Sequence, residues 1–242
     1  MNGVLVYSED GAKANAFAIN KFKENLGVRL VLKSDVNFNE SPPFVINRTN
    51  DFKIAEGFEK KGIRVFNPRL LTEIANNKQK TYDFMESHNI EILPTRYTGV
   101  PAVKKANAGH GGTEVFMITE PEEFEEGFVY QKPATDLGQD LRVWLINGKI
   151  ITAVLRKSNT DFRANFSLGG TAEVYTLSDS EKELTLKIGA LLPHDFIGID
   201  FVFNNGKIVF NEIEDSVGSR TVYEKTNIDI IKLYCDYIKS EI

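Results

Sequence analysis

The amino-acid sequence predicts a mixed fold, with an α/β lobe at the N-terminus and a longer α+β lobe rich in antiparallel strands after it, divided near residue 75. Before this point, short apolar runs of strand length alternate with segments of helical periodicity, which is the pattern of β-α-β units. Beyond about residue 88, strand-like runs dominate. Two of their joins are the Asn-Gly pairs at 147–148 and 205–206, the strongest short-range signal of a β-hairpin.

The N-terminal lobe is expected to contain four short strands, at residues 3–7, 28–33, 44–48 and 63–66. Helical spacing of apolar residues predicts helices at 12–26 and 51–61 and two more between 67 and 88. Asp51 and Asn67 stand where N-caps are favoured, and Pro68 suits the first position of the helix after Asn67. Gly27 and Gly62 follow helical segments that they can end.

The second lobe is expected to be built mainly from strands, at residues 100–106, 114–118, 127–132, 141–146, 149–157, 196–203 and 207–214. One helix interrupts them at 180–192, where Pro193 ends it, and an amphipathic helix at 228–238 closes the chain. The sequence contains no internal repeat and no low-complexity tract.

The composition restricts the class of protein. The chain has 242 residues, with 34 Asp and Glu against 29 Lys and Arg, and this net charge of −5 argues against nucleic acid as the main partner. A single cysteine, Cys235, excludes an internal disulfide framework and fits a reducing cytoplasm. The acidic residues among the first ten argue against a signal peptide, and no apolar run approaches membrane-spanning length. We therefore expect a cytoplasmic protein.

Three carboxylates, Asp200, Glu212 and Glu214, interrupt the apolar strands of the second Asn-Gly hairpin. A two-residue loop at 205–206 would turn Asp200 away from Glu212, whereas a three-residue loop at 204–206 would bring the carboxylates to one face. We predict the three-residue loop. The face would then comprise Asp200, Val202, Ile208, Phe210, Glu212 and Glu214.

Carboxylates gathered in this way repel one another unless a hard cation lies between them, and Mg²⁺ is bound through one or two carboxylates together with substrate phosphates. The alternative is a solvated acidic strand end. Zinc is not expected, because His88, His110 and His194 are scattered and the chain lacks a cysteine cluster.

A small-residue loop follows Lys104 and contains Gly109, Gly111 and Gly112. Glycines let backbone N–H groups approach phosphate oxygens, and a neighbouring lysine adds positive charge, although a plain hairpin loop gives the same pattern. Three arginines, Arg142, Arg156 and Arg163, follow on or near the first hairpin. Each alone is typical of a protein surface, but together they suit triphosphate and acyl-phosphate oxygens.

The order of these features resembles that of the ATP-grasp superfamily, most closely its RimK-type carboxylate–amine ligases, from about residue 45 to residue 230. The resemblance is carried by GQDLRVWLINGKIITAVLRK, DFRANFSLGG and GIDFVFNNGKIVFNEIEDSVG. An Asp followed twelve residues later by Glu-x-Asn is the metal signature of the family, and here the segment reads Asp200, Glu212 and Glu214.

The resemblance implies a set of nucleotide contacts and metal ligands. Phosphate contacts fall on Lys78 (with Lys80 as the alternative) and Lys104, under the loop of Gly109, Gly111 and Gly112. Adenine would lie beside Gln131 and Lys132, and Asp140, Arg163 and Asn165 would also contact the nucleotide. Asp200, Glu212 and Glu214 would hold Mg²⁺, with Mn²⁺ as an alternative ion.

Two features depart from the family pattern. Glu214 replaces the usual Asn at the third metal position, which is expected to strengthen or reshape metal binding. The segment at 94–103 is too short for the helix that usually separates two strands there, so the lid, at about 90–130, is expected to be shortened. The predicted domains are residues 1–75 and an ATP-grasp domain at 76–242.

The activity that the resemblance implies is ligation of an amino acid, with glutamate the first candidate, to a carboxylate of a peptide, protein tail or metabolite through an acyl phosphate. Arg142, Arg156 and Arg163 would act in catalysis, and Arg220 would hold a substrate carboxylate. The alternatives are a peptide-modifying ligase that joins side chains, a nucleotide-binding module without ligation, and a phosphotransferase. The resemblance also favours a homodimer.

Overall fold

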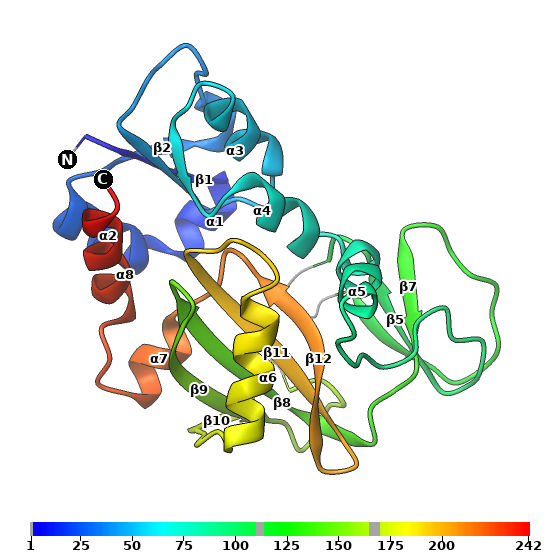
Figure 1. Ribbon diagram of the computed structural model, residues 1–242. Coiled ribbons are helices and arrows are strands. Elements are labelled where there is room, and N and C mark those ends of the chain that lie inside the picture. The colour runs from blue at the N-terminus through cyan, green and yellow to red at the C-terminus, as the bar shows by residue number, and fades with distance from the viewer. Residues whose placement is uncertain (1, 110–113, 165–169) are drawn as a thin grey trace.

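The protein is described here by a computed structural model that covers residues 2–109, 114–164 and 170–242. It contains a four-stranded, a three-stranded and a five-stranded sheet. Figure 1 shows the four-stranded sheet and its helices at the top of the molecule, the five-stranded sheet below them and the three-stranded sheet to the right. The predicted mixture of an α/β lobe with antiparallel sheets is therefore confirmed.

The four-stranded sheet is parallel and has the strand order β2-β1-β3-β4. Its strands are β1 (Val4–Tyr7), β2 (Arg29–Leu32), β3 (Phe44–Asn47) and β4 (Arg64–Phe66). One face packs on α2 (Ala16–Leu26) and the C-terminal helix α8 (Ile230–Ser240), and the other packs on α3 (Phe52–Glu59). The helix expected at 12–26 is two helices, because α1 (Glu9–Ala14) ends at Asn15 and α2 starts directly after it.

Two short helices lead from the parallel sheet to the rest of the chain, α4 (Arg69–Ala75) and α5 (Lys78–Ser87). The expected N-cap at Asn67 is wrong, since Pro68 precedes α4 and no side chain caps it. The amide of Asn67 is used elsewhere. It accepts hydrogen bonds from the backbone N–H groups of Asp195 and Phe196 and donates to the carbonyl oxygens of Phe196 and Asp215, at 2.7 to 2.9 Å. Asn67 thereby joins the end of β4 to the five-stranded sheet.

The three-stranded sheet is antiparallel, with the order β6-β5-β7. It consists of β5 (Ala102–Ala106), β6 (Val115–Ile118) and β7 (Phe128–Gln131). The described residues between α5 and β7 contain no helix, in agreement with the expected shortening of this region. Figure 1 shows α5 against this sheet, at its border with the centre of the molecule.

The five-stranded sheet is antiparallel and has the order β10-β9-β8-β11-β12. It consists of β8 (Asp136–Ile146), β9 (Lys149–Lys157), β10 (Thr171–Val174), β11 (Phe196–Asn204) and β12 (Lys207–Glu214), and it is flanked by α6 (Asp179–Gly189) and α7 (Arg220–Lys225). The α6 side of the sheet is an apolar core that includes Leu141, Val143 and Phe201. Alternation along the strands therefore directs the polar residues of β8, β9 and β11 to the opposite side.

The β11–β12 hairpin differs from the prediction in its loop length and in the position of its extra residue. Its loop has two residues, Asn205 and Gly206, both with positive φ, and the expected three-residue loop is wrong. Asp200 nevertheless pairs with Glu212, because a β-bulge at Asn211 adds one residue to β12. Two members of the predicted face, Ile208 and Phe210, instead belong to the apolar core on the α6 side.

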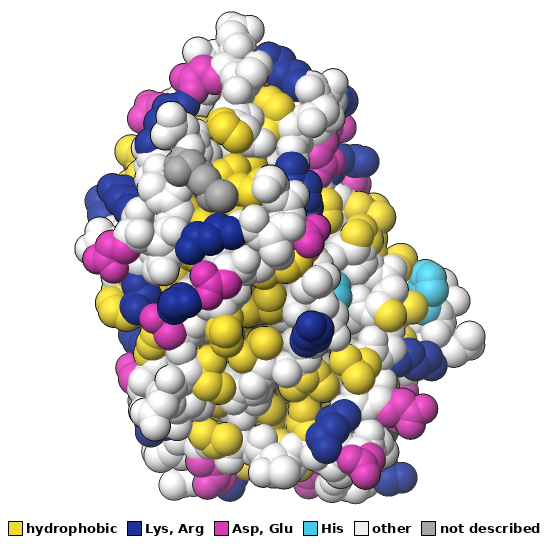
Figure 2. Space-filling model, turned by 60° about the vertical axis from the view of Figure 1, so that its left-hand side comes forward, with side chains coloured by type: hydrophobic (Ala, Val, Ile, Leu, Met, Phe, Trp, Pro, Cys, Tyr) yellow, Lys and Arg dark blue, Asp and Glu magenta, His cyan; other side chains and the backbone are white. Residues whose placement is uncertain are grey.

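The surface mixes charges of both signs. Figure 2 shows Lys and Arg interspersed with Asp and Glu over the face drawn, with apolar side chains between them. None of the helices in the described residues has the length and apolar character needed to cross a membrane.

Candidate active site

A pocket lies between the three-stranded and the five-stranded sheets. One part of its wall is apolar and includes Leu93, Val103, Leu137 and Val202. The other part is charged, and includes Lys78, Lys105, Asp140, Arg156, Arg163, Asp200 and Glu212. An elongated ligand with an apolar ring at one end and several negative charges at the other matches this division.

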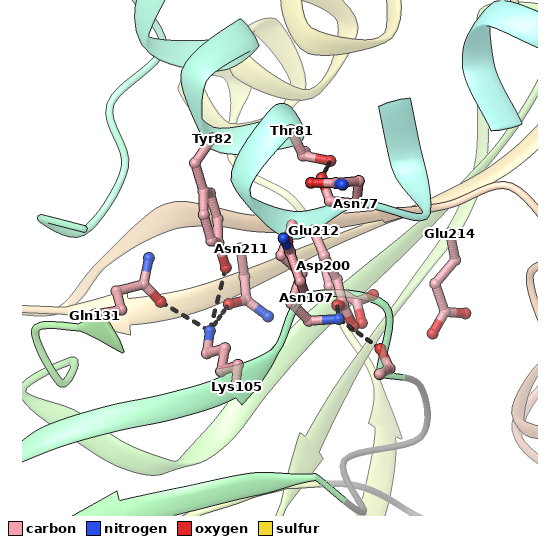
Figure 3. A network of polar contacts seen from close by, with 12 residues as sticks. Asn77, Thr81, Tyr82, Lys105, Asn107, Gln131, Asp200, Asn211, Glu212 and Glu214 are labelled. Carbon is pink, nitrogen blue, oxygen red and sulfur yellow. Dashed lines mark hydrogen bonds and ion pairs between the residues drawn. The ribbon is translucent and has the colours of Figure 1, made fainter. Parts of the chain in front are cut away.

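Of the two adjacent lysines on β5, Lys105 is the one that lines this pocket. Its Nζ donates to Gln131 Oε1 and Asn211 Oδ1, each at 2.8 Å, and lies 3.3 Å from the Tyr82 hydroxyl (Figure 3). Burial lowers the pKa of Lys105 to about 8. A desolvated ammonium group held by neutral partners is well suited to an anionic ligand, which would restore a full counter-charge.

Lys104, the lysine predicted to contact phosphate, points to the other side of β5 and does not line the pocket. Its ammonium group lies 3.0 Å from Glu122 and 2.6 Å from Glu125, over the rings of Phe128 and Tyr130. The hydrogen bonds that it donates to these carboxylates raise the pKa of Lys104. The prediction was wrong by one residue, because neighbouring residues of a strand face opposite sides.

Lys78 begins α5 and lines both this pocket and a neighbouring cleft. Its Nζ donates to the carbonyl oxygen of Gly109 at 2.6 Å and is 3.4 Å from Glu212. Lys80, the alternative, does not line the pocket and pairs instead with Glu73. Gly109 lines the pocket as well, whereas Gly111 and Gly112 lie outside the described residues.

Two arginines and three carboxylates form a buried network on β8, β9, β11 and β12. Arg142 makes a bidentate pair with Asp200 at 2.7 and 2.6 Å and reaches Glu214 at 2.6 Å. Arg156 makes a second bidentate pair with Asp140 at 2.5 and 2.9 Å and lies 3.0 Å from Asp200. Burial acts to raise the pKa of Asp200, yet the two arginines hold it below its ordinary value.

The three carboxylates predicted to converge do so. Asp200, Glu212 and Glu214 each offer an oxygen, and these oxygens lie within 4.8 Å of one another (Figure 3). Burial raises the pKa of Glu214 to about 7, since its charge is removed from water beside two other carboxylates. Oxygen donors at this spacing fit a hard divalent cation.

The remaining predicted residues are divided. Gln131, Lys132, Asp140 and Arg163 all line the pocket. The backbone N–H of Lys132 donates to Pro94, so this segment is fixed beside the apolar wall. Asn165 lies outside the described residues.

Two of the predicted arginines do not line the pocket. Arg142 lies behind it, and Arg220 begins α7 with its side chain 67% exposed, 3.9 Å from Glu224. Sequence analysis also missed Lys105 and Asn211. A strand alternation counted from buried Val103 would have indicated Lys105, whereas nothing in the sequence marks the bulge that directs Asn211 inward.

A second cleft, of about 640 Å³, adjoins the pocket and shares Lys78 and Glu212 with it. Its other walls come from the carboxyl ends of β1 and β3, from α4 and from the end of β12. Tyr7, Ser8, Arg48, Glu73, Glu214 and Asp215 are among its lining residues. The carboxylates of the candidate cation site therefore lie at the boundary between the pocket and the second cleft.

Comparison with known proteins agrees with this arrangement. A family model described as the RimK-like ATP-grasp domain matches residues 50–238. The uncharacterized protein MG011 of Mycoplasma genitalium is 27% identical over 91% of this chain and 86% of its own. Human N-acetylaspartylglutamate synthase A is 26% identical over 89% of this chain and 64% of its own, and human β-citrylglutamate synthase B is 26% identical over 81% and 58%.

Among solved structures, the ATP-grasp ligase PsnB complexed with minimal precursor superposes with a TM-score of 0.73, at 17% identity and full coverage of both chains. A second structure of PsnB, with a phosphomimetic precursor variant, Mg and ADP, gives a TM-score of 0.72 at 15% identity over 98% of this chain and 97% of PsnB. At this identity the likeness shows the fold.

Two antiparallel sheets that enclose a pocket lined by lysines and carboxylates agree with the ATP-grasp fold. ATP-grasp ligases are a class of ATP-dependent enzymes. Within that class, the chain belongs to the RimK-like ATP-grasp family. The predicted resemblance is confirmed.

Proposed function

We propose that this protein is an ATP-dependent carboxylate–amine ligase that forms an amide bond through an acyl phosphate, with glutamate as the amine substrate. The observation that carries the proposal is the pair of adjoining clefts, which share Lys78 and Glu212. A transfer between a nucleotide and two further substrates needs such a junction, because the reacting atoms must meet at one point.

The nucleotide fits the pocket between the sheets. Its adenine would lie against Leu93, Val103 and Leu137, next to the backbone of the Gln131–Lys132 segment, and its phosphates would lie toward Lys78 and Lys105, all of which line the pocket. Asp200 and Glu212 would hold Mg²⁺, with Glu214 completing the set of carboxylates. The bound ion would neutralise charge on the phosphate oxygens.

The chemistry requires positioning and charge compensation from the protein. A substrate carboxylate oxygen attacks the γ-phosphorus of ATP as the bond to the ADP oxygen breaks, and the amine then displaces phosphate from the acyl carbon. Lys78 and Arg156, which line the nucleotide pocket, would offset negative charge on the transferring group. Arg142 lines neither cleft and therefore suits a positioning role, holding Asp200 and Glu214.

Glutamate is supported by the names of two relatives. The products of N-acetylaspartylglutamate synthase and β-citrylglutamate synthase both contain glutamate joined to another carboxylic acid. This chain covers 64% and 58% of their lengths, so the acid partner is left to experiment.

Mass spectrometry of a reaction with Mg-ATP, amino acids and short carboxylate-bearing peptides tests the proposal. We expect ADP together with an adduct that has lost one water, and no adduct with Asp200→Asn, which keeps the side-chain shape but weakens cation binding. A phosphorylated product without an amide would replace ligation with phosphotransfer. Bound ATP without turnover would favour a binding module.

A further inference from the structure

The second cleft opens at a topologically special place in the parallel sheet. With the strand order β2-β1-β3-β4, the chain runs from β1 to β2 on one side and then crosses to β3 on the other. Open parallel sheets bind ligands at the carboxyl ends of their strands where the winding direction reverses in this way. Tyr7 is the last residue of β1, Arg48 directly follows β3, and both line the cleft.

Both residues carry hydrogen-bond donors without partners. Tyr7 is only 2% exposed, and neither its hydroxyl group nor Nε of Arg48 meets an acceptor within the part of the chain that the structure describes. Buried polar groups in native proteins are nearly always paired, so unpaired donors beside a cleft indicate a ligand that supplies the acceptors.

The charge of Arg48 is also uncompensated. The lysines of the same cleft lie close to carboxylates, Lys33 to Asp51 at 2.9 Å, Lys78 to Glu212 at 3.4 Å and Lys80 to Glu73 at 3.1 Å. Arg48 forms no ion pair with any residue of the described ranges. A ligand with a negative charge would therefore find Arg48 ready to bind it, without first breaking an ion pair.

The guanidinium of Arg48 is already oriented. Its Nη2 donates to the carbonyl oxygen of Val217 at 2.6 Å, and its plane lies over the ring of Phe196, with 5.7 Å from Cζ to the ring centroid. The hydroxyl of Ser216 donates to the Arg48 carbonyl oxygen at 3.2 Å. Two of these contacts come from the segment after β12 and one from the first residue of β11, so they place Arg48 relative to the carboxylates of the candidate cation site.

We infer that Tyr7 and Arg48 anchor the non-reacting carboxylate of an amino-dicarboxylic acid substrate, of which L-glutamate is the test case. A carboxylate supplies two acceptor oxygens and a negative charge, which the phenol and guanidinium donors lack in the free protein. The amino group would then extend toward Lys78 and Glu212, where the two clefts meet. The inference rests on the proposed ligase function and specifies which feature of the amine is recognised.

The test measures binding and turnover with Arg48→Ala, Arg48→Lys and Tyr7→Phe. In the presence of Mg-ADP, we expect Arg48→Ala to raise the calorimetric Kd for L-glutamate about tenfold or more, and Tyr7→Phe to raise it about threefold. The KM for L-glutamate should rise in parallel, with the KM for ATP within about twofold of wild type. Arg48→Lys, which keeps the charge and loses Nε, should fall between.

Arg29→Ala is the matched control, because Arg29 on the neighbouring strand β2 is half-exposed and pairs with Glu40 away from the cleft. It should leave all of these constants within about twofold. Wild type should also prefer L-glutamate to L-glutamine, and Arg48→Ala should reduce that preference.

The outcomes separate the anchor from the ligase function. Amide formation with an unchanged KM for L-glutamate in Arg48→Ala would overturn the anchor and leave the ligase intact. If no amide forms, calorimetry still decides, since wild type that binds neither L-glutamate nor glutarate overturns the anchor as well. If Arg48→Ala lowers the melting temperature, the isosteric Tyr7→Phe and the charge-conserving Arg48→Lys carry the test.

Discussion

Lys104 and Lys105 are adjacent in the chain and have opposite environments. Lys104 is held by two carboxylates on the outside of β5, and Lys105 is buried among neutral groups in the pocket. Their sequence context is the same, so only the side of the strand distinguishes them. Which of the two lysines lines the pocket depends on which face of β5 meets the five-stranded sheet, and this is a property of the tertiary structure.

The two lysines therefore make a matched pair for mutation. We expect Lys105→Ala to weaken ATP binding by about tenfold or more, because a charged hydrogen bond to phosphate is lost. Lys104→Ala should change the affinity by less than about twofold. Isothermal titration calorimetry with a non-hydrolysable ATP analogue measures both affinities. Equal effects of the two variants would contradict the assignment of the phosphate contact to Lys105.

The lowered pKa of Lys105 predicts how nucleotide affinity depends on pH. Below its pKa of about 8 the side chain is charged, and above it the charge is lost. The Kd for ATP should therefore rise about tenfold between pH 7 and pH 9. Lys105→Arg, which stays charged, should show a flatter profile. The same slope in both proteins would show that another group controls the titration.

The same residue contributes to stability with a defined sign. In the unfolded chain Lys105 has the ordinary lysine pKa of 10.5, so between pH 8 and 10.5 the unfolded chain binds more protons at this residue. The contribution of Lys105 destabilises the folded protein at low pH, and this cost is relieved as the pH rises through that window. Urea denaturation of wild type and Lys105→Met at pH 7 and pH 10 measures this contribution. The stability advantage of Lys105→Met over wild type should be larger at pH 7 than at pH 10.

At the scale of elements, the β11–β12 hairpin shows how a correct site can follow from an incorrect register. The carboxylates were expected to converge through a three-residue loop, and they converge through a two-residue loop and a bulge. In both cases one unpaired residue lies between Asp200 and Glu212, either in the loop or in the bulge. The number of residues between the two carboxylates is the same for both, so the sequence spacing does not distinguish them. Packing of Phe210 in the core decides where the extra residue lies.

Gly206 is the position in this hairpin where conformation limits substitution. Its φ of 73° lies in the left-handed region, and no atom would contact an added Cβ. Gly206→Ala should lower the free energy of unfolding by about 1–2 kcal/mol through backbone strain alone. ATP affinity should stay unchanged. Gly218→Ala, also without a contact at Cβ but without positive φ, is the control for urea denaturation, and an equal loss in both would exclude the strain argument.

Long elements with clear periodicity or an Asn-Gly turn were predictable, and short elements stabilised only by tertiary contacts were not. β10 has four residues and is mostly exposed, so no alternation marks it. α7 has six residues and one buried side chain, Val222. Arg220, which was expected to hold a substrate carboxylate, is the first residue of α7 and its side chain is exposed.

At the scale of the whole molecule, Asn67 ties the lobes together. It is 3% exposed, and removing its amide would break its hydrogen bonds to two backbone N–H groups and two carbonyl groups. We expect Asn67→Ala to lower the free energy of unfolding by about 3 kcal/mol or more. Asn76→Ala, which removes one bond within α4, should cost about 1 kcal/mol. Similar losses in urea denaturation would show that the junction contributes little.

The buried network around Asp200 has a consequence for how the whole protein responds to salt. Four carboxylates, Asp140, Asp200, Glu212 and Glu214, face four cationic side chains, Lys78, Lys105, Arg142 and Arg156, so their formal charges cancel. Long-range electrostatic attraction depends on the product of the net charges of the site and the ligand, and this product is zero for a neutral site. Ionic screening therefore has little to act on, and nucleotide affinity should be nearly independent of ionic strength. Such an enzyme would bind its nucleotide with the same affinity at low and at high intracellular salt concentration.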